Sequence, residues 1–256
     1  MLRWDETAAL SEMRCTRAWV EINLEALAHN VKAIKALLSP ETQLMSVVKA
    51  DAYGHGALTV AHTVLQAGAT WLGVATVPEG IELRQAGVDA PILVMGAVND
   101  PAEVLAIARW KLQPTIVNRK QALMFSEELE SAHFQGGTAQ NTQNETVRDS
   151  RTEARMKPLP VHLKIDTGMS RLGFPWNRST ELASFVQQLP HIEAASVYSH
   201  FATADSPEPT TMWKQHQRFE RAIADLSQAN LRPPKTHLAN SAATLTDASL
   251  HYAIVR

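Results

Sequence analysis

Short apolar segments alternate with amphipathic helical segments along most of this chain, and this alternation restricts the possible folds more than any other feature. A strand, a helix and a second strand in succession favour parallel pairing with a right-handed connection. Eight segments predict such strands, because most of them are short and either β-branched or continuously apolar, as strands covered on both faces are. They are residues 44–49, 71–75, 92–95, 113–117, 161–165, 193–198, 235–238 and 254–255.

A further strand at residues 16–22 and a helix at residues 24–38 are predicted before this series. The helix is predicted because its apolar residues stand three or four positions apart, and Asn23 is a candidate N-cap. The remaining helices are predicted between the strands, at residues 57–67, 77–86, 101–110, 119–130, 177–189, 212–228 and 242–249.

Eight parallel strands with helical connections predict a closed (β/α)8 barrel, for which about 250 residues is typical. Periodicity alone leaves an open, doubly wound sheet as the alternative. We expect residues 1–15 to form an N-terminal tail and residues 16–256 to form the barrel. The segment at about 135–157 interrupts the pattern, because it is nearly free of aliphatic side chains, and it predicts a flexible polar insertion.

The charge balance and the cysteine content argue against several classes of protein. The formal net charge is -2 and the sequence pI is about 6.6, which argues against nucleic acid as the main partner. Cys15 is the only cysteine, so neither an intrachain disulfide nor a cysteine-based zinc site can form. No apolar run approaches the roughly 20 residues of a membrane span, and residues 1–17 lack the apolar centre of a secretion signal. We therefore expect a cytoplasmic enzyme or binding protein with no membrane partner and no metal site.

Side chains suited to catalysis gather at the predicted carboxyl ends of the strands, where barrel enzymes carry their active sites. Each of them alone also has a structural explanation, as a charged strand end, a loop ion pair or a core histidine. Together they fit a pyridoxal-phosphate site, because a lysine can form an imine, a serine at a helix start can bind a phosphate and an arginine can bind an acidic group. Asp166 could pair with the nearby arginine or cap the following turn. The candidates are Lys49, Arg171, His200, Ser241 and Arg256.

Four segments, in the same order, resemble the motifs of bacterial alanine racemase. They are VVKADAYGHG at residues 47–56, DTGMSRLG at 166–173, HFATAD at 200–205 and ANSA at 239–242. The opening AWVEIN at residues 18–23 is also similar. The resemblance covers about residues 16–256 apart from the polar insertion.

The resemblance implies a fold-type III pyridoxal-phosphate enzyme whose barrel is followed by a β-rich C-terminal domain. It implies a cytoplasmic isomerase, acting as a homodimer, that interconverts L-alanine and D-alanine for peptidoglycan precursors. Lys49 matches the lysine that holds pyridoxal 5′-phosphate as an imine and moves the α-proton on the D-alanine side. Arg171 matches the arginine that engages the substrate carboxylate and the phenolic oxygen of the cofactor. Lys164 matches a lysine that carries a carbamate in some members and orients that arginine.

The remaining matches are implied to surround the cofactor. Tyr53 and Ser241 match contacts to its phosphate, and Asn240 stands beside them. His200 matches the residue that packs against the cofactor ring, and His237 matches a supporting residue.

Arg256 matches the arginine that faces the pyridine nitrogen of the cofactor. An arginine stays charged and only donates hydrogen bonds, so it should keep that nitrogen unprotonated and make the ring a weaker electron sink. In the family pattern the second base is a tyrosine of the C-terminal domain, contributed across a dimer interface. Because this chain ends at Arg256, we expect a truncated racemase that has little activity alone.

Two other kinds of function are compatible with these residues. One is a broad-specificity amino-acid racemase or another fold-type III enzyme such as a decarboxylase, because the filter for substrate size lies largely in the C-terminal domain of the family. The other is a non-catalytic barrel protein that binds pyridoxal phosphate, a class whose length this chain fits. Activity toward alanine distinguishes these alternatives.

Overall fold

The computed structural model describes residues 20–138 and 157–256. Eight of its strands close into a barrel, because β4 pairs with β5 and β1 pairs with β9, and all these pairings are parallel. The predicted (β/α)8 barrel is therefore confirmed and the open sheet is excluded. The strands are β1 (Gln43–Val47), β2 (Trp71–Val74), β3 (Ile92–Ala97), β4 (Gln113–Ile116), β5 (Leu159–Asp166), β7 (Ile192–Tyr198), β8 (Lys235–His237) and β9 (Ile254–Val255).

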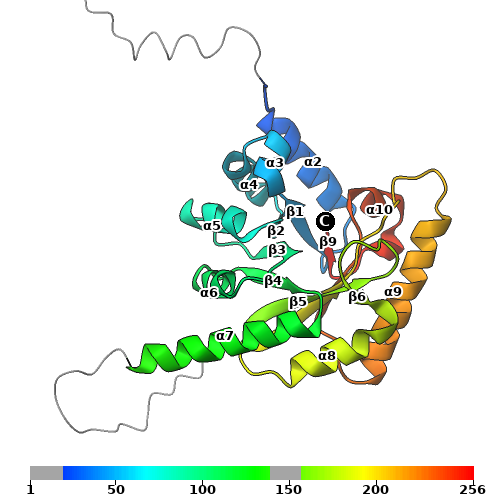
Figure 1. Ribbon diagram of the computed structural model, residues 1–256. Coiled ribbons are helices and arrows are strands. Elements are labelled where there is room, and N and C mark those ends of the chain that lie inside the picture. Colours follow the sequence, from blue (N-terminus) through cyan, green and yellow to red (C-terminus); the bar gives the residue numbers. More distant parts are fainter. Residues whose placement is uncertain (1–19, 139–156) are drawn as a thin grey trace, which may run out of the picture.

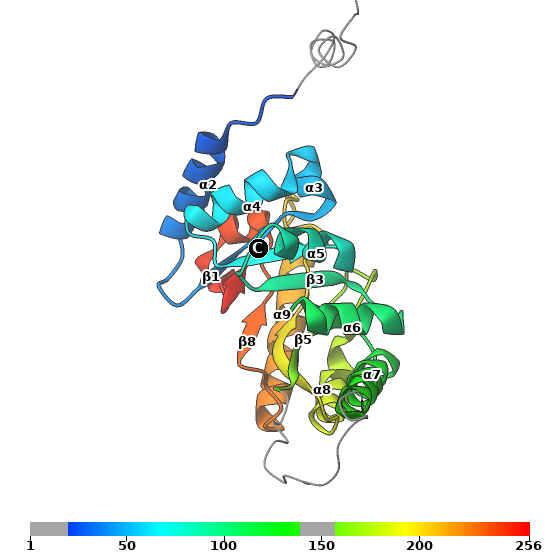
Figure 2. The ribbon, with the colours of Figure 1, turned by 90° about the vertical axis from the view of Figure 1, so that its left-hand side faces the viewer.

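The helices lie around the outside of the strands, as Figures 1 and 2 show from two directions. Asn23 is the N-cap of α2, as predicted, because its Oδ1 accepts a hydrogen bond from the Ala26 N–H at 2.9 Å. Within the part of the chain that the structure describes, no helix is long and apolar enough to cross a membrane. The helices are α2 (Leu24–Ala36), α3 (Lys49–Gly54), α4 (Ala57–Gln66), α5 (Val77–Gln85), α6 (Pro101–Arg109), α7 (Arg119–Thr138), α8 (Ser179–Gln187), α9 (Thr210–Gln228) and α10 (Ser241–Thr246), with short 3₁₀ turns at Trp176–Arg178 and Ala248–Leu250.

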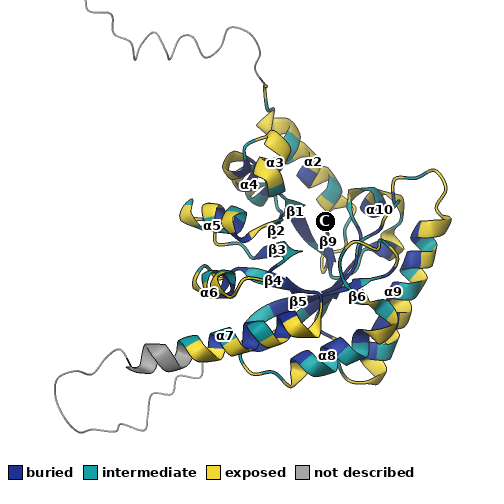
Figure 3. Ribbon diagram, in the orientation of Figure 1, coloured by how far each residue is buried: buried dark blue, intermediate teal, exposed yellow. Residues whose placement is uncertain are grey.

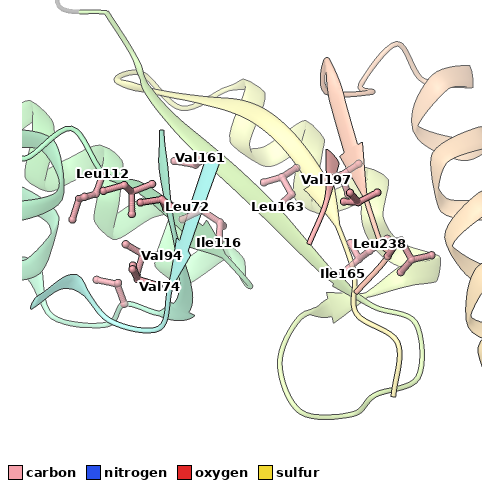
Figure 4. Packing of buried hydrophobic residues seen from close by; sticks show 14 of the residues in the cluster. Leu72, Val74, Val94, Leu112, Ile116, Val161, Leu163, Ile165, Val197 and Leu238 are labelled. Carbon is pink, nitrogen blue, oxygen red and sulfur yellow. The ribbon is translucent and has the colours of Figure 1, made fainter. Parts of the chain in front are cut away.

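Side chains on the two faces of the barrel strands enter two different cores. In β2, Leu72 and Val74 belong to the outer core, which lies between strands and helices, whereas Trp71 belongs to a small cluster inside the barrel. This is the two-residue alternation of a strand. Figure 4 shows part of the outer core, and Figure 3 shows that buried residues follow the strands and the inward faces of the helices. The inner cluster consists of Met45, Trp71, Leu93, Tyr198 and Ile254.

The structure corrects the prediction for the segment before α2. The strand predicted at residues 16–22 is wrong in its described part, because residues 20–22 form no strand and Val20 is 79% exposed. Residues 16–19 lie outside the described residues. The physical reason is that a closed barrel has no free edge, and β1 already pairs with β2 and β9.

One other predicted segment is largely untested, and one strand was not predicted. The polar insertion predicted at about 135–157 lies outside the described residues except at its ends, where residues 135–138 continue α7. The strand β6 (Phe174–Pro175) was not predicted. Its two residues pair with the end of β5, and a segment of that length carries no periodic signal.

Candidate functional site

The carboxyl ends of the barrel strands surround a cavity of about 640 Å³. All the residues predicted at the site line this cavity, except His237, which is fully buried and hydrogen-bonded to Arg256. The predicted residues therefore come together at one cavity, because parallel strands bring their carboxyl ends to one rim. The lining residues that were predicted are Lys49, Tyr53, Lys164, Arg171, His200, Asn240, Ser241 and Arg256.

Lys49 stands at the start of an uncommon backbone turn. The sequence pattern predicted that Lys49 is the last residue of a strand. In the structure β1 ends at Val47, and Lys49 is the first residue of α3. Residues 50–53 have φ between 52° and 57°, a left-handed conformation that costs roughly 1–2 kcal/mol per residue. Such strain persists only where surrounding contacts hold it, and it is concentrated at functional sites. The turn brings Lys49 Nζ to 5.8 Å from the ring centroid of Tyr53.

Two carboxylates that the sequence analysis missed hold this turn. Glu79 on α5 accepts hydrogen bonds from the Ala50 N–H at 3.0 Å and the Ala75 N–H at 2.7 Å. Asp51 accepts one from the Ala57 N–H at 2.6 Å, which ties the turn to the start of α4. From the sequence alone, Glu79 is recognisable only as an acidic residue near the start of a helix. Its hydrogen bond to the Ala50 N–H depends on the contact between α5 and α3.

Lys164 projects from β5 into the barrel and is only 6% exposed. Its Nζ lies 4.7 Å from the ring centroid of Tyr198. Burial, followed by the positive charges of Arg256 and Arg171, lowers the pKa of Lys164 from 10.5 to about 7. Near neutral pH, a substantial fraction of the protein molecules therefore carries Lys164 as a neutral, nucleophilic amine.

Tyr198, at the end of β7, links several of these groups. Its ring stacks on His237 with the centroids 4.5 Å apart and the planes 4° from parallel, and the guanidinium carbon of Arg256 lies 5.3 Å from its centroid. Its hydroxyl group shares a hydrogen bond of 2.7 Å with Thr115. Burial raises the pKa of Tyr198 to about 12, so the phenol stays protonated. Its sequence position gives no functional signal, because a tyrosine at the end of an apolar strand resembles any core residue.

Hydrogen bonds to neighbouring strands and loops hold the guanidinium group of Arg256 in place. Its Nη1 donates to His237 Nδ1 at 2.7 Å, and its Nη2 donates to His200 Nδ1 at 3.1 Å and to the Ser199 carbonyl at 2.9 Å. Burial and the charge of Arg256 lower the pKa of His200 to about 3 and hold the pKa of His237 well below its ordinary value. Both rings are therefore neutral, and each presents an acceptor nitrogen to the guanidinium.

The loop after β5 presents Arg171, which is exposed and lines the cavity. Asp166 shapes this loop, because its Oδ1 accepts hydrogen bonds from the N–H groups of Gly168, Met169 and Ser170 at 2.9–3.1 Å. Of the two roles predicted for Asp166, the structure therefore shows the cap of the turn.

The loop after β8 leads into α10. Asn240 is the N-cap of this helix, since its Oδ1 accepts a hydrogen bond from the Ala243 N–H at 3.0 Å. Ser241 is the first residue of α10, is exposed and lines the cavity. The cavity thus combines two lysine amines, two guanidinium groups and hydroxyl groups. This combination suits a flat, anionic molecule with an aldehyde group, and an amino-acid carboxylate beside it.

Comparison with known proteins relates the site to a family. The family profile described as "Alanine racemase, N-terminal domain" matches residues 22–256. A protein of Nostoc sp. described as alanine racemase is 57% identical over 240 residues, which are 94% of this chain and 57% of that protein. An alanine racemase of Geobacillus stearothermophilus is 36% identical over 239 residues, covering 93% of this chain and 54% of that protein.

A solved structure gives the same result. The alanine racemase of Clostridium difficile 630 superposes with a TM-score of 0.81 at 31% identity, covering 94% of this chain and 60% of that one. This chain therefore spans a little over half the length of the relatives that it matches.

Proposed function

Because this chain belongs to the alanine racemase family, we propose that it binds pyridoxal 5′-phosphate in the cavity and serves the interconversion of L-alanine and D-alanine. The observation that carries the proposal is that Lys49, Arg171 and Arg256 line one cavity of about 640 Å³. That volume lies within the usual range of small-molecule sites, about 300–1,000 Å³. The three side chains supply an amine for imine formation, a partner for the substrate carboxylate and a donor for a ring nitrogen.

The residues present fit this cofactor chemically. Tyr53 and Ser241 have hydroxyl groups that can donate to a phosphate. His200, whose Nδ1 lies 3.1 Å from Arg256 Nη2, has an imidazole ring against which a flat ring can pack. When bound, pyridoxal phosphate supplies an electron sink that makes the α-hydrogen of an amino acid acidic enough to be removed.

The side chains of this chain then have separate tasks. Lys49 would hold the cofactor, and its amine would take or return the α-proton of the D enantiomer. Arg171 binds the substrate carboxylate. Arg256 would donate toward the ring nitrogen and keep it unprotonated, which would limit the electron sink and reduce transamination as a side reaction. One lysine serves one face of the substrate, so the other face needs a second base, for which the family resemblance implies a tyrosine of a further domain.

The proposal includes the setting that the resemblance implies. D-alanine made by this reaction would supply peptidoglycan precursors in the cytoplasm, and the full-length protein would act as a homodimer.

Attachment of the cofactor to a single lysine tests the proposal directly. We expect the chain, mixed with pyridoxal phosphate and reduced with borohydride, to gain one stable adduct on the peptide that contains Lys49. Lys49 lines the open cavity beside Tyr53, whereas Lys164 lies deeper, at 6% exposure. Mass spectrometry of the digested chain locates the adduct. An adduct distributed over exposed lysines such as Lys120 would contradict a specific site.

Exchange of the α-hydrogen tests the catalytic part. In D₂O with pyridoxal phosphate, we expect the 256-residue chain to exchange the α-hydrogen of D-alanine faster than that of L-alanine, because Lys49 serves the D side. Loss of the α-hydrogen signal in proton NMR measures both rates. D-serine and D-lysine serve as comparison substrates, and rates equal to that of D-alanine would favour a broad-specificity racemase. No exchange with the cofactor attached would favour a non-catalytic binding protein.

A further inference from the structure

A line of hydrogen-bonded polar side chains crosses the inside of the barrel below the cavity. Arg256 Nη1 lies 2.7 Å from His237 Nδ1, and His237 Nε2 lies 3.2 Å from Ser196 Oγ. Ser196 Oγ lies 2.6 Å from His162 Nδ1, and His162 Nε2 lies 2.8 Å from Gln113 Oε1. The line therefore runs from the end of β9 at the cavity to Gln113, the first residue of β4, at the opposite end of the barrel.

The arginine sets the direction of every hydrogen bond in this line. A guanidinium only donates, so His237 Nδ1 must accept, and the single proton of a neutral ring then sits on Nε2. His237 therefore donates to Ser196. The serine hydroxyl, having accepted this hydrogen bond, directs its own hydrogen to His162 Nδ1, the closer of its two imidazole partners.

The far end of the line agrees with this direction. If His162 Nδ1 accepts, the proton of that ring sits on Nε2 and is donated to Gln113 Oε1, which is an acceptor. His162, Ser196 and His237 are all fully buried, with 0% exposure. Burial, followed by the charge of Lys235, lowers the pKa of His162 to about 3, so this ring is neutral as the line requires.

We propose that Gln113, His162 and Ser196 are positioning residues for Arg256, acting through a one-way line of donated hydrogen bonds that holds His237 in its Nε2–H form. We call Gln113, His162, Ser196, His237 and Arg256 together the donor line. The inference rests on the proposed function, because it assigns the donor line to the arginine that faces the cofactor ring.

The consequence for Arg256 is geometric. His237 can hold the guanidinium only while its Nδ1 is bare and its ring is fixed at both nitrogens. Without the Ser196 hydroxyl, the Nε2–H of His237 loses its acceptor inside a dry core, where an unpaired polar group is costly. The ring then turns toward a new partner, and Arg256 loses a fixed acceptor although no residue of the cavity wall has changed.

Nuclear magnetic resonance of the histidine and arginine side chains tests the donor line without any cofactor. In the ¹⁵N-labelled 256-residue chain, we expect both His162 and His237 to carry their proton on Nε2 from about pH 5 to pH 8, the range in which an ordinary histidine titrates. In Ser196→Ala, we expect the Nε2–H of His237 to exchange faster with water and the Arg256 Nε–H signal to shift. We also expect the cofactor to bind about fivefold more weakly, the equivalent of one hydrogen bond.

Two matched variants separate positioning from packing. Ser126→Ala removes a buried hydroxyl on α7 that donates to the Pro190 carbonyl at 2.7 Å, away from the donor line, and should leave the Arg256 signal and the cofactor affinity unchanged. Ser196→Thr retains the hydroxyl and should restore both.

Two results would overturn the inference. One is a proton on Nδ1 of either histidine. The other is that Ser196→Ala, like Ser126→Ala, leaves the Arg256 signal and the cofactor affinity unchanged. A chain that binds no cofactor would contradict the proposed function instead, and the cofactor-free spectra would still decide the direction of the donor line.

Discussion

The Lys49→Ala chain is expected to lose nearly all of the visible absorbance that pyridoxal phosphate gives when it is joined to the protein as an imine. Lys49 is the amine that shares the open cavity with Tyr53 and the two arginines, so its removal leaves only non-covalent contacts for the cofactor. A spectrophotometric titration of the purified chain with pyridoxal phosphate measures the effect. Because Lys49 is half-buried at the rim and not in the core, we expect the variant to remain folded.

A matched lysine variant controls for the loss of a positive charge. Lys120 is exposed on α7, outside the cavity, and Lys120→Ala should keep the full absorbance. Equal absorbance in the two variants would count against Lys49 as the attachment residue and would direct attention to Lys164, the other lysine that lines the cavity.

The second large effect is expected for Lys164→Met, measured as the free energy of unfolding in CO₂-free buffer. The pKa of Lys164 is about 7 in the folded chain and 10.5 ordinarily, so between these values the unfolded chain binds more protons. The free energy of unfolding of the unmodified chain must then rise as pH increases from about 7 to 10. Below pH 7 the amine of Lys164 is charged, and its burial destabilises the folded chain by the full amount. Methionine carries no charge, so the variant should be more stable at pH 7 by about 1–4 kcal/mol and should show a flatter pH profile.

Addition of bicarbonate gives this experiment a second arm. The neutral amine of Lys164 can attack the carbon of CO₂, forming an N–C bond and releasing a proton to solvent, which yields a carbamate anion. Arg171 and Arg256, whose charges lower the pKa of this lysine, would stabilise that anion. We therefore expect bicarbonate to stabilise the chain with Lys164 and to leave Lys164→Met unchanged. Equal pH profiles of the two chains would contradict a buried, neutral lysine at this position.

Much of the fold and the location of the site could be predicted from the sequence. The repeated strand and helix segments predicted the barrel, because strands covered on both faces leave a strong apolar signal. The same pattern placed Lys49, His200 and Arg256 at one rim, since parallel strands all end there. It failed at residues 20–22, the described part of a segment that resembled a strand, where the closed barrel offers no edge to pair with.

The connections inside the site could not be predicted in this way. Glu79 resembles an ordinary helix-start residue, and its hydrogen bond to the strained turn after Lys49 depends on how α5 packs. Tyr198 resembles a core residue, yet it lies between His237 and the charged groups of Lys164 and Arg256.

The sequence by itself determined that strands alternate with helices and which side chains stand at the carboxyl rim, because apolar strand segments and strand ends are local properties. Only the tertiary structure decided which of these side chains meet. The hydrogen bond between His162 and Ser196 forms because β5 and β7 are neighbours in one particular register, and a slip of one residue in either strand would turn its side chain to the other face. The hydrogen-bond partners of Arg256, and the lowered pKa of Lys164, follow from that register and from the closure of the barrel around them.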